Sequence, residues 1–210
     1  MNKRILFYGD SNTWGYRPGG ERLPANRRYT TMVTRQAPDI IPVVDGLNGR
    51  STAFESSLVP PELLGGATFA ASLRKADNPD GLVVMLGTND VMPPLSLDAE
   101  TVGDNMRRII RTAREICPCM GIVVIVSPPP LAPCAVRAIR DDTGCDAELL
   151  GTDLAPFLRK AADAEGASFL SGESIIPYMD AQDGFHLNDI GHLRIGLGIG
   201  SLLRSLTLPH

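Results

Sequence analysis

Short apolar runs alternate with longer amphipathic segments along the chain. The runs favour strands and lie at Ile5–Tyr8, Ile40–Val44, Leu82–Leu86, Ile122–Val126 and Ser168–Leu170. Helices are predicted between and after them, at Tyr29–Gln36, Glu62–Lys75, Asp98–Ile116, Asp146–Ala164 and Gly191–Leu206. Alternation of this kind is typical of a parallel sheet wrapped by helices.

The segment Asp98–Ile116 has the clearest helical pattern, because its apolar residues recur on one stripe while its arginines face away. The stripe consists of Val102, Met106, Ile109, Ile110, Ala113 and Ile116. Gly191–Leu206 is interrupted by glycines, so we predict a closely packed helix there. Ser127–Cys145 begins Ser-Pro-Pro-Pro and is predicted to be a long connection, a kind of segment that is often functional.

Pro42 indicates the order of the strands. Proline lacks the N–H that a central strand needs, so the second strand should lie at an edge. The flavodoxin-like order 2-1-3-4-5 places it there. We therefore predict an α/β, flavodoxin-like three-layer sandwich with a five-stranded parallel sheet, forming one domain over residues 1–210.

Composition excludes several classes of partner. The net charge of −4 comes without a basic stripe, which argues against nucleic acid binding. No stretch approaches the roughly 20 apolar residues of a membrane span, and the short apolar run before Gly9 does not match a signal peptide. The four cysteines lack zinc-ligand spacing, so we expect reduced thiols in a cytoplasmic protein.

Four residues with chemical potential follow the predicted strands or precede the last helix: Ser11, Gly49, Asn89 and His186. Ligands of open α/β sheets bind beyond the carboxyl ends of the strands, so these residues are expected to share one site. A serine hydroxyl needs a base, and an imidazole is suited to that role. His186 is the preferred base, and Asp183 is placed to orient its ring.

Alternatives to this assignment remain at the sequence level. Asp183 could be a solvated carboxylate in a turn, and Ser11 a helix N-cap. His210 is the last residue, and His192 is predicted to be a surface or capping residue. Asp10 and Asp90 are expected to brace loops through backbone N–H groups, although paired carboxylates can also hold magnesium.

The stretch Gly9-Asp10-Ser11-Asn12-Thr13-Trp14-Gly15, with Gly49, Asn89 and His186, resembles the SGNH (GDSL) hydrolases, and within them the arylesterase and acetyl-esterase branch. Asn12 replaces the leucine of the GDSL motif, a position to which we assign no catalytic role. The resemblance implies an oxyanion hole made by the Ser11 and Gly49 backbone N–H groups and the Asn89 amide. It also implies that Trp14 forms a wall of the substrate pocket, and that neither metal nor cofactor is used.

The sequence thus predicts a serine esterase that hydrolyses small acetyl or aryl esters through an acyl-enzyme, with acyl transfer to alcohols as a side reaction. A thioesterase or lysophospholipase of the same family is the close alternative. A phosphate-binding module is disfavoured because the Gly9–Gly15 loop lacks the P-loop lysine. A receiver domain built on Asp10 would need a lysine after the fifth strand. Apart from the ester, we expect self-association and neither nucleic acid nor membrane as partner.

Overall fold

The computed structural model describes residues 2–143 and 154–207. Five parallel strands form one sheet in the order β2-β1-β3-β4-β5. They are β1 (Lys3–Gly9), β2 (Ile40–Gly46), β3 (Gly81–Met85), β4 (Ile122–Ser127) and β5 (Ser168–Ser171). The five predicted strands and their order are confirmed, and β2, which carries Pro42, is an edge strand.

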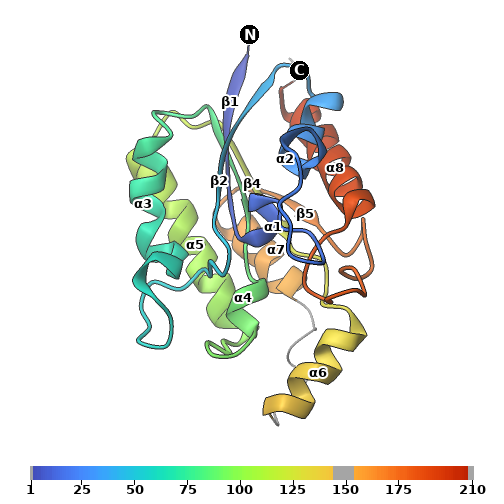
Figure 1. The fold of residues 1–210 in the computed structure, drawn as a ribbon. Helices are drawn as coiled ribbons and strands as arrows, with labels where there is room; N and C mark the ends of the chain where they lie inside the picture. The colour runs from blue at the N-terminus through green and yellow to red at the C-terminus, as the bar shows by residue number, and fades with distance from the viewer. Residues whose placement is uncertain (1, 144–153, 208–210) are drawn as a thin grey trace.

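The α-helices alternate with the strands along the chain (Figure 1). They are α1 (Ser11–Trp14), α2 (Tyr29–Met32), α3 (Gly65–Lys75), α4 (Thr88–Val91), α5 (Ala99–Ile116), α6 (Pro133–Thr143), α7 (Leu154–Ala164) and α8 (Asp189–Thr207). Short 3-10 helices lie at Ala25–Arg27, Val33–Arg35 and Pro61–Leu63. Among residues 2–143 and 154–207, no helix has both the length and the apolar character that a membrane crossing requires.

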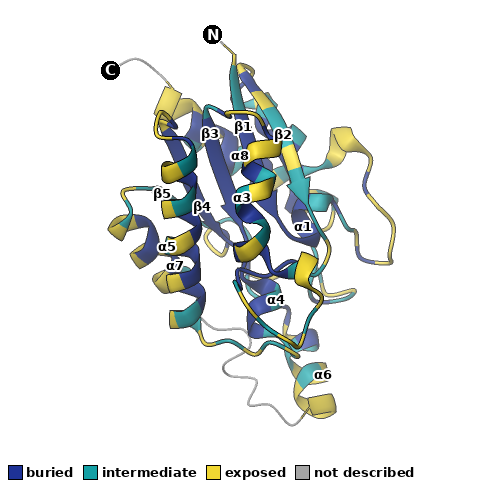
Figure 2. Cartoon of the chain, turned by 90° about the vertical axis from the view of Figure 1, so that its left-hand side faces the viewer, coloured by how far each residue is buried: buried dark blue, intermediate teal, exposed yellow. Residues whose placement is uncertain are grey.

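Two hydrophobic layers lie on opposite faces of the sheet. Successive residues of a strand point to opposite faces, so Leu6 and Tyr8 pack with α3, α5 and α7, whereas Ile5 and Phe7 pack with α2 and α8. Figure 2 shows the central strands β1, β3 and β4 as the buried centre of the molecule, whereas the edge strands β2 and β5 are partly exposed. The sheet and its two helical layers make the predicted three-layer sandwich.

Most predicted helices are confirmed, with changes at their ends. The 29–36 segment is a short α-helix continued as a 3-10 helix, and 62–75 starts with a 3-10 turn. α5 begins after Asp98, whose side chain accepts the Thr101 N–H at 2.7 Å as an N-cap. The predicted helix Asp146–Ala164 is seen as α7, and its residues 146–153 lie outside the described residues.

The long connection predicted over Ser127–Cys145 is wrong for most of its length, because α6 occupies Pro133–Thr143. Only Ala135 of this helix is buried, so the helix contributes little to either core. It extends away from the carboxyl end of the sheet (Figure 1). β1 starts and α8 ends at the opposite end of the molecule in both ribbon views.

Candidate active site

Ser11 is the first residue of α1 and lies two residues after the end of β1. Asp10 caps this helix, because its carboxylate accepts the Asn12 N–H at 2.9 Å. The N-cap is therefore Asp10 and not Ser11, whose hydroxyl is available for other contacts. Gly15 ends the helix with a positive φ of 93°, so the segment 11–14 forms a single tight turn at the edge of the sheet.

His186 lies in the loop before α8, 175 residues after Ser11, and reaches it directly. Its Nε2 is 3.0 Å from Ser11 Oγ, and its Nδ1 is 2.8 Å from Asp183 Oδ2. Because a carboxylate can only accept, Nδ1 carries the proton and Nε2 is left to accept the Ser11 hydroxyl. The structure thus brings the predicted nucleophile, base and orienting residue into one chain of hydrogen bonds.

Asp183 also shapes the loop around His186. Its other oxygen accepts the backbone N–H groups of Phe185 and His186 at 2.9 and 3.1 Å. The carboxylate therefore fixes both the backbone turn and the ring that the turn carries. Asp183 Oδ1 thus has the role of a turn carboxylate, which was the alternative prediction, while Oδ2 holds the imidazole.

Gly49 and Asn89 lie at the ends of the neighbouring strands. Gly49 has a φ of 81°, which favours glycine, in a turn attached to β1 by the Leu47 N–H to Gly9 O hydrogen bond. The Asn89 side chain donates to the backbone oxygen of Arg50 at 2.9 Å. That contact uses one of the two N–H groups of the amide.

Arg50 is a residue of the site that sequence reasoning missed. Its guanidinium is buried and donates to the Gly9 and Asp45 backbone oxygens and to the Asp45 carboxylate at 2.7–3.0 Å. It also lies over the Tyr8 ring, 4.2 Å from the centroid. Arg50 therefore ties the Gly49 turn to Gly9, the last residue of β1, two residues before Ser11.

The two buried carboxylates next to the site act as braces, as expected. Asp90 accepts the Thr52 backbone N–H at 2.8 Å, and Asp10 caps α1. Burial raises the pKa of Asp10 to about 7 and the pKa of Asp90 to about 6, because desolvation penalises the charged form. Within residues 2–143 and 154–207, no group of three His, Cys, Asp or Glu side chains is arranged to hold a metal ion.

Trp14 is separated from His186 by another aromatic residue. The Tyr16 ring lies 4.3 Å from the His186 ring and 6.2 Å from the Trp14 ring. Arg22 covers Trp14 with its guanidinium 4.4 Å from the centroid. Tyr16, which sequence reasoning missed, is thus the ring in contact with the imidazole, with Trp14 behind it.

The prediction that His192 is a surface or capping residue is wrong. Its side chain is fully buried, and its Nδ1 accepts the Tyr29 N–H at 3.2 Å where α8 packs on α2. Burial lowers the pKa of His192 to about 4. His210 and Cys145 lie outside the described residues. Among the described residues, Cys117, Cys119 and Cys134 have free thiols.

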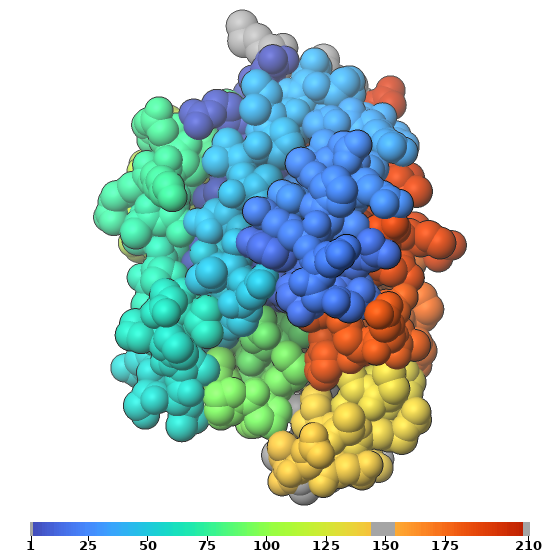
Figure 3. Space-filling view, viewed as in Figure 1, coloured from blue at the N-terminus to red at the C-terminus, as the bar shows by residue number. Residues whose placement is uncertain are grey.

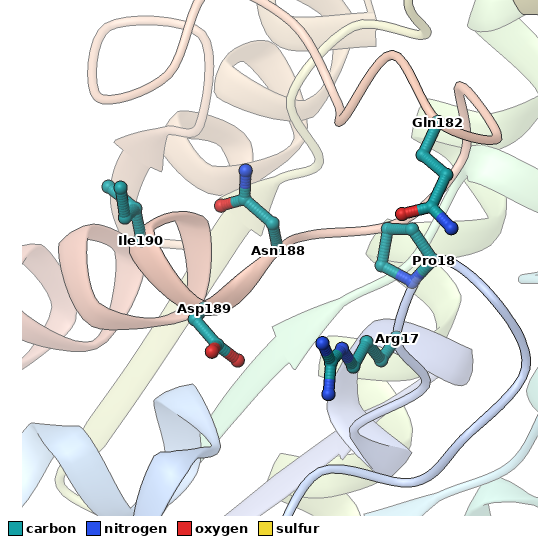
Figure 4. Close-up of a pocket in the computed structure, with 6 residues that line it drawn as sticks. All are labelled: Arg17, Pro18, Gln182, Asn188, Asp189 and Ile190. Carbon is teal, nitrogen blue, oxygen red and sulfur yellow. The ribbon is translucent and has the colours of Figure 1, made fainter.

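A cavity of about 320 Å³ borders the His186 loop (Figure 4). It is lined by Arg17, Pro18, Gln182, Asn188, Asp189 and Ile190. These residues come from the segment after Tyr16 and from the two sides of His186, and Figure 3 shows the N-terminal and C-terminal segments meeting on this face of the molecule. Neither Ser11 nor His186 lines the cavity itself.

Known proteins share the fold of this chain. No curated protein sequence matches the chain significantly. A carbohydrate acetylesterase family member from Sinorhizobium meliloti has 29% sequence identity and a TM-score of 0.85, covering 97% of this chain and 98% of its own. The inhibitor-bound aryl esterase of M. smegmatis has 26% identity and a TM-score of 0.84, covering 97% and 99%. Residues 7–194 match the GDSL-like lipase/acylhydrolase family. The chain therefore belongs to this family.

Proposed function

We propose that the protein is a serine esterase in which Ser11 attacks, His186 transfers the proton and Asp183 orients His186. Ester hydrolysis as the class of reaction follows from the family and from the esterases among its structural neighbours. The observation that carries the residue assignment is the hydrogen-bonded series Ser11–His186–Asp183, with distances of 3.0 and 2.8 Å.

The proposed reaction has two halves. Ser11 Oγ bonds to the ester carbonyl carbon while its proton passes to His186 Nε2. The tetrahedral intermediate then collapses, the ester C–O bond breaks, and the alcohol leaves with that proton. Water repeats the same steps on the acyl-enzyme, or another alcohol takes the acyl group, and Ser11 is regenerated.

We assign the oxyanion hole to the Ser11 N–H, the Gly49 N–H and the Asn89 amide. One N–H of the Asn89 amide donates to Arg50 O, which fixes the orientation of the amide and leaves its second N–H for the oxyanion. One such donor is worth about 2.7–4 kcal/mol of transition-state stabilisation. The Arg50 contacts with Gly9 and Asp45 hold the Gly49 turn near the other two donors.

A short acyl group with a polar alcohol half is the proposed substrate. The leaving alcohol must lie next to His186 Nε2, the atom that protonates it. The cavity that borders the His186 loop is lined by charged and amide side chains from Arg17, Gln182 and Asp189, which suit hydroxyl groups. Trp14 is proposed as the backing of the Tyr16 wall. The thioesterase or lysophospholipase alternative would need a long apolar channel.

The two non-esterase alternatives are disfavoured. A receiver domain would need an accessible Asp10, whereas this side chain is 1% exposed and caps α1. A phosphate-binding module would not require the Ser11–His186–Asp183 series. The cytoplasmic location and self-association remain predictions.

Mutation of the triad tests the proposal. Ser11→Ala and His186→Ala should each abolish hydrolysis of p-nitrophenyl acetate, and Asp183→Asn should lose less, since its role is orientation. A phosphonate probe should add its mass to the parent protein and not to Ser11→Ala. Activity of Ser11→Ala within tenfold of the parent would reject the assignment.

A further inference from the structure

Asn12, directly after Ser11, reaches the backbone on both sides of His186. Its Oδ1 accepts the Leu187 N–H at 2.9 Å, and its Nδ2 donates to the Phe185 carbonyl at 3.3 Å. The side chain is 1% exposed, so water does not compete for these contacts. One amide group therefore holds the two peptide units that flank the imidazole.

The same residue is fixed at the Ser11 end. The Asn12 N–H is held by Asp10, the cap of α1, so its side chain extends from a rigid turn. Two other backbone hydrogen bonds of the His186 loop do not involve α1. His186 O accepts from Asp180 N, and Gly184 O accepts from Ala132 N. Asn12 instead connects the loop to the helix that carries Ser11.

We infer that Asn12 is a positioning residue that sets the distance between Ser11 and His186. This inference rests on the proposed function. The family's leucine at this position has no polar atoms and could make neither hydrogen bond, so the expectation that Asn12 is irrelevant to catalysis is replaced. The amide is suited to the role because it pairs one donor and one acceptor with the complementary groups of the loop.

The consequence for catalysis is specific to proton transfer. His186 takes a proton from Ser11 and gives it to the leaving alcohol, and a displacement of about 1 Å can cost about a hundredfold in rate. An alkyl alcohol needs that second transfer, whereas p-nitrophenoxide is a good leaving group without it. A misplaced imidazole therefore slows the acylation step more for alkyl acetates than for p-nitrophenyl acetate.

The test measures kcat/KM, which reports acylation, for ethyl acetate and p-nitrophenyl acetate in the parent and Asn12→Leu. We expect a loss of about tenfold on p-nitrophenyl acetate and about a hundredfold on ethyl acetate. Asn12→Asp keeps the acceptor for the Leu187 N–H and should fall between the parent and the leucine variant.

Thr13→Val is the matched control. It removes another buried hydrogen bond of α1, between Thr13 Oγ1 and the Tyr29 hydroxyl at 2.7 Å, and should leave the ratio of the two kcat/KM values unchanged. Equal losses on both esters in Asn12→Leu, or no loss, would overturn the inference. If Asn12→Leu fails to fold, Asn12→Ala is judged by the same ratio. An active Ser11→Ala would reject the proposed function instead, which keeps the two failures distinct.

Discussion

At the scale of single residues, the Tyr16 ring covers one face of the His186 imidazole, with their centroids 4.3 Å apart. An aromatic face attracts a cation. In the proposed reaction His186 becomes a cation when it takes the proton of Ser11, so we expect Tyr16 to stabilise the charge that develops.

Replacing Tyr16 by leucine should therefore lower kcat about fivefold with little change in KM. Tyr16→Phe retains the ring and should behave as the parent. Steady-state measurements of kcat and KM for the parent and both variants distinguish the outcomes. If phenylalanine and leucine cost the same, the hydroxyl group and not the ring is responsible.

A separate prediction concerns Asp10 and the pH dependence of the free energy of unfolding. Burial raises its pKa from 3.8 to about 7, so the folded chain holds this proton where the unfolded chain has lost it. The resulting stabilisation of the folded state is fully present below pH 3.8, the ordinary pKa of the group, and is lost as the pH rises through about 7. Asp10→Asn, which still caps α1, removes that dependence. Relative to the parent, the variant should gain in free energy of unfolding as the pH is raised.

Urea unfolding at a series of pH values measures this difference. Asp98→Asn is a control of opposite sign, because hydrogen bonds from Thr101 lower the pKa of Asp98. The contribution of Asp98 is present above its unfolded pKa and is lost as the pH falls. Parallel curves for the parent and Asp10→Asn would show that Asp10 is not protonated in the folded protein.

At the scale of elements, the strands and their order could be predicted because each leaves a local signal. β3 and β4 are buried on both faces and appear as continuous apolar runs, while Pro42 marks an edge. α6 was missed because it follows the run Ser-Pro-Pro-Pro, which favours a connection, and because it buries only Ala135.

The glycines of α8 have a packing reason. A Cβ on Gly196 would lie 2.7 Å from the Tyr29 carbonyl oxygen, so the glycine permits close approach of α2. Gly196→Ala should destabilise the protein by about 1–3 kcal/mol through overpacking. A Cβ on Gly121 would meet nothing within 4 Å, so Gly121→Ala should be silent. Denaturant midpoints at constant m-value measure both, and equal midpoints would contradict the packing argument.

At the scale of the whole molecule, the site is assembled at the carboxyl ends of β1, β2 and β3 with the loop before α8. Ser11, Gly49, Asn89 and His186 could be selected from the sequence because the ends of the strands can be recognised there and the family motifs are specific. Their catalytic roles remain proposals. Tyr16, Arg50 and the role of Asn12 could not be recognised in this way. Their partners are fixed by tertiary packing, as in the Asn12 contact across 175 residues.

We predict that this site prefers a short acyl chain. Tyr16, backed by Trp14, lies against His186, and the stiff Pro128–Pro130 segment that follows β4 is the proposed second wall. Each methylene that fits an apolar pocket gains about 0.8 kcal/mol, so kcat/KM would rise with chain length in a deep channel. We expect a maximum at acetate and a fall beyond about four carbons, measured with p-nitrophenyl esters from acetate to decanoate. A maximum at octanoate would favour the lysophospholipase alternative.

The start of β1 and the end of α8 lie together at the end of the molecule opposite the strand ends that carry Ser11 and Asn89. A support or a fused protein joined through either of them is therefore held away from the mouth of the site. An esterase anchored in this way presents its catalytic face outward, so immobilised molecules should keep the turnover number of free ones.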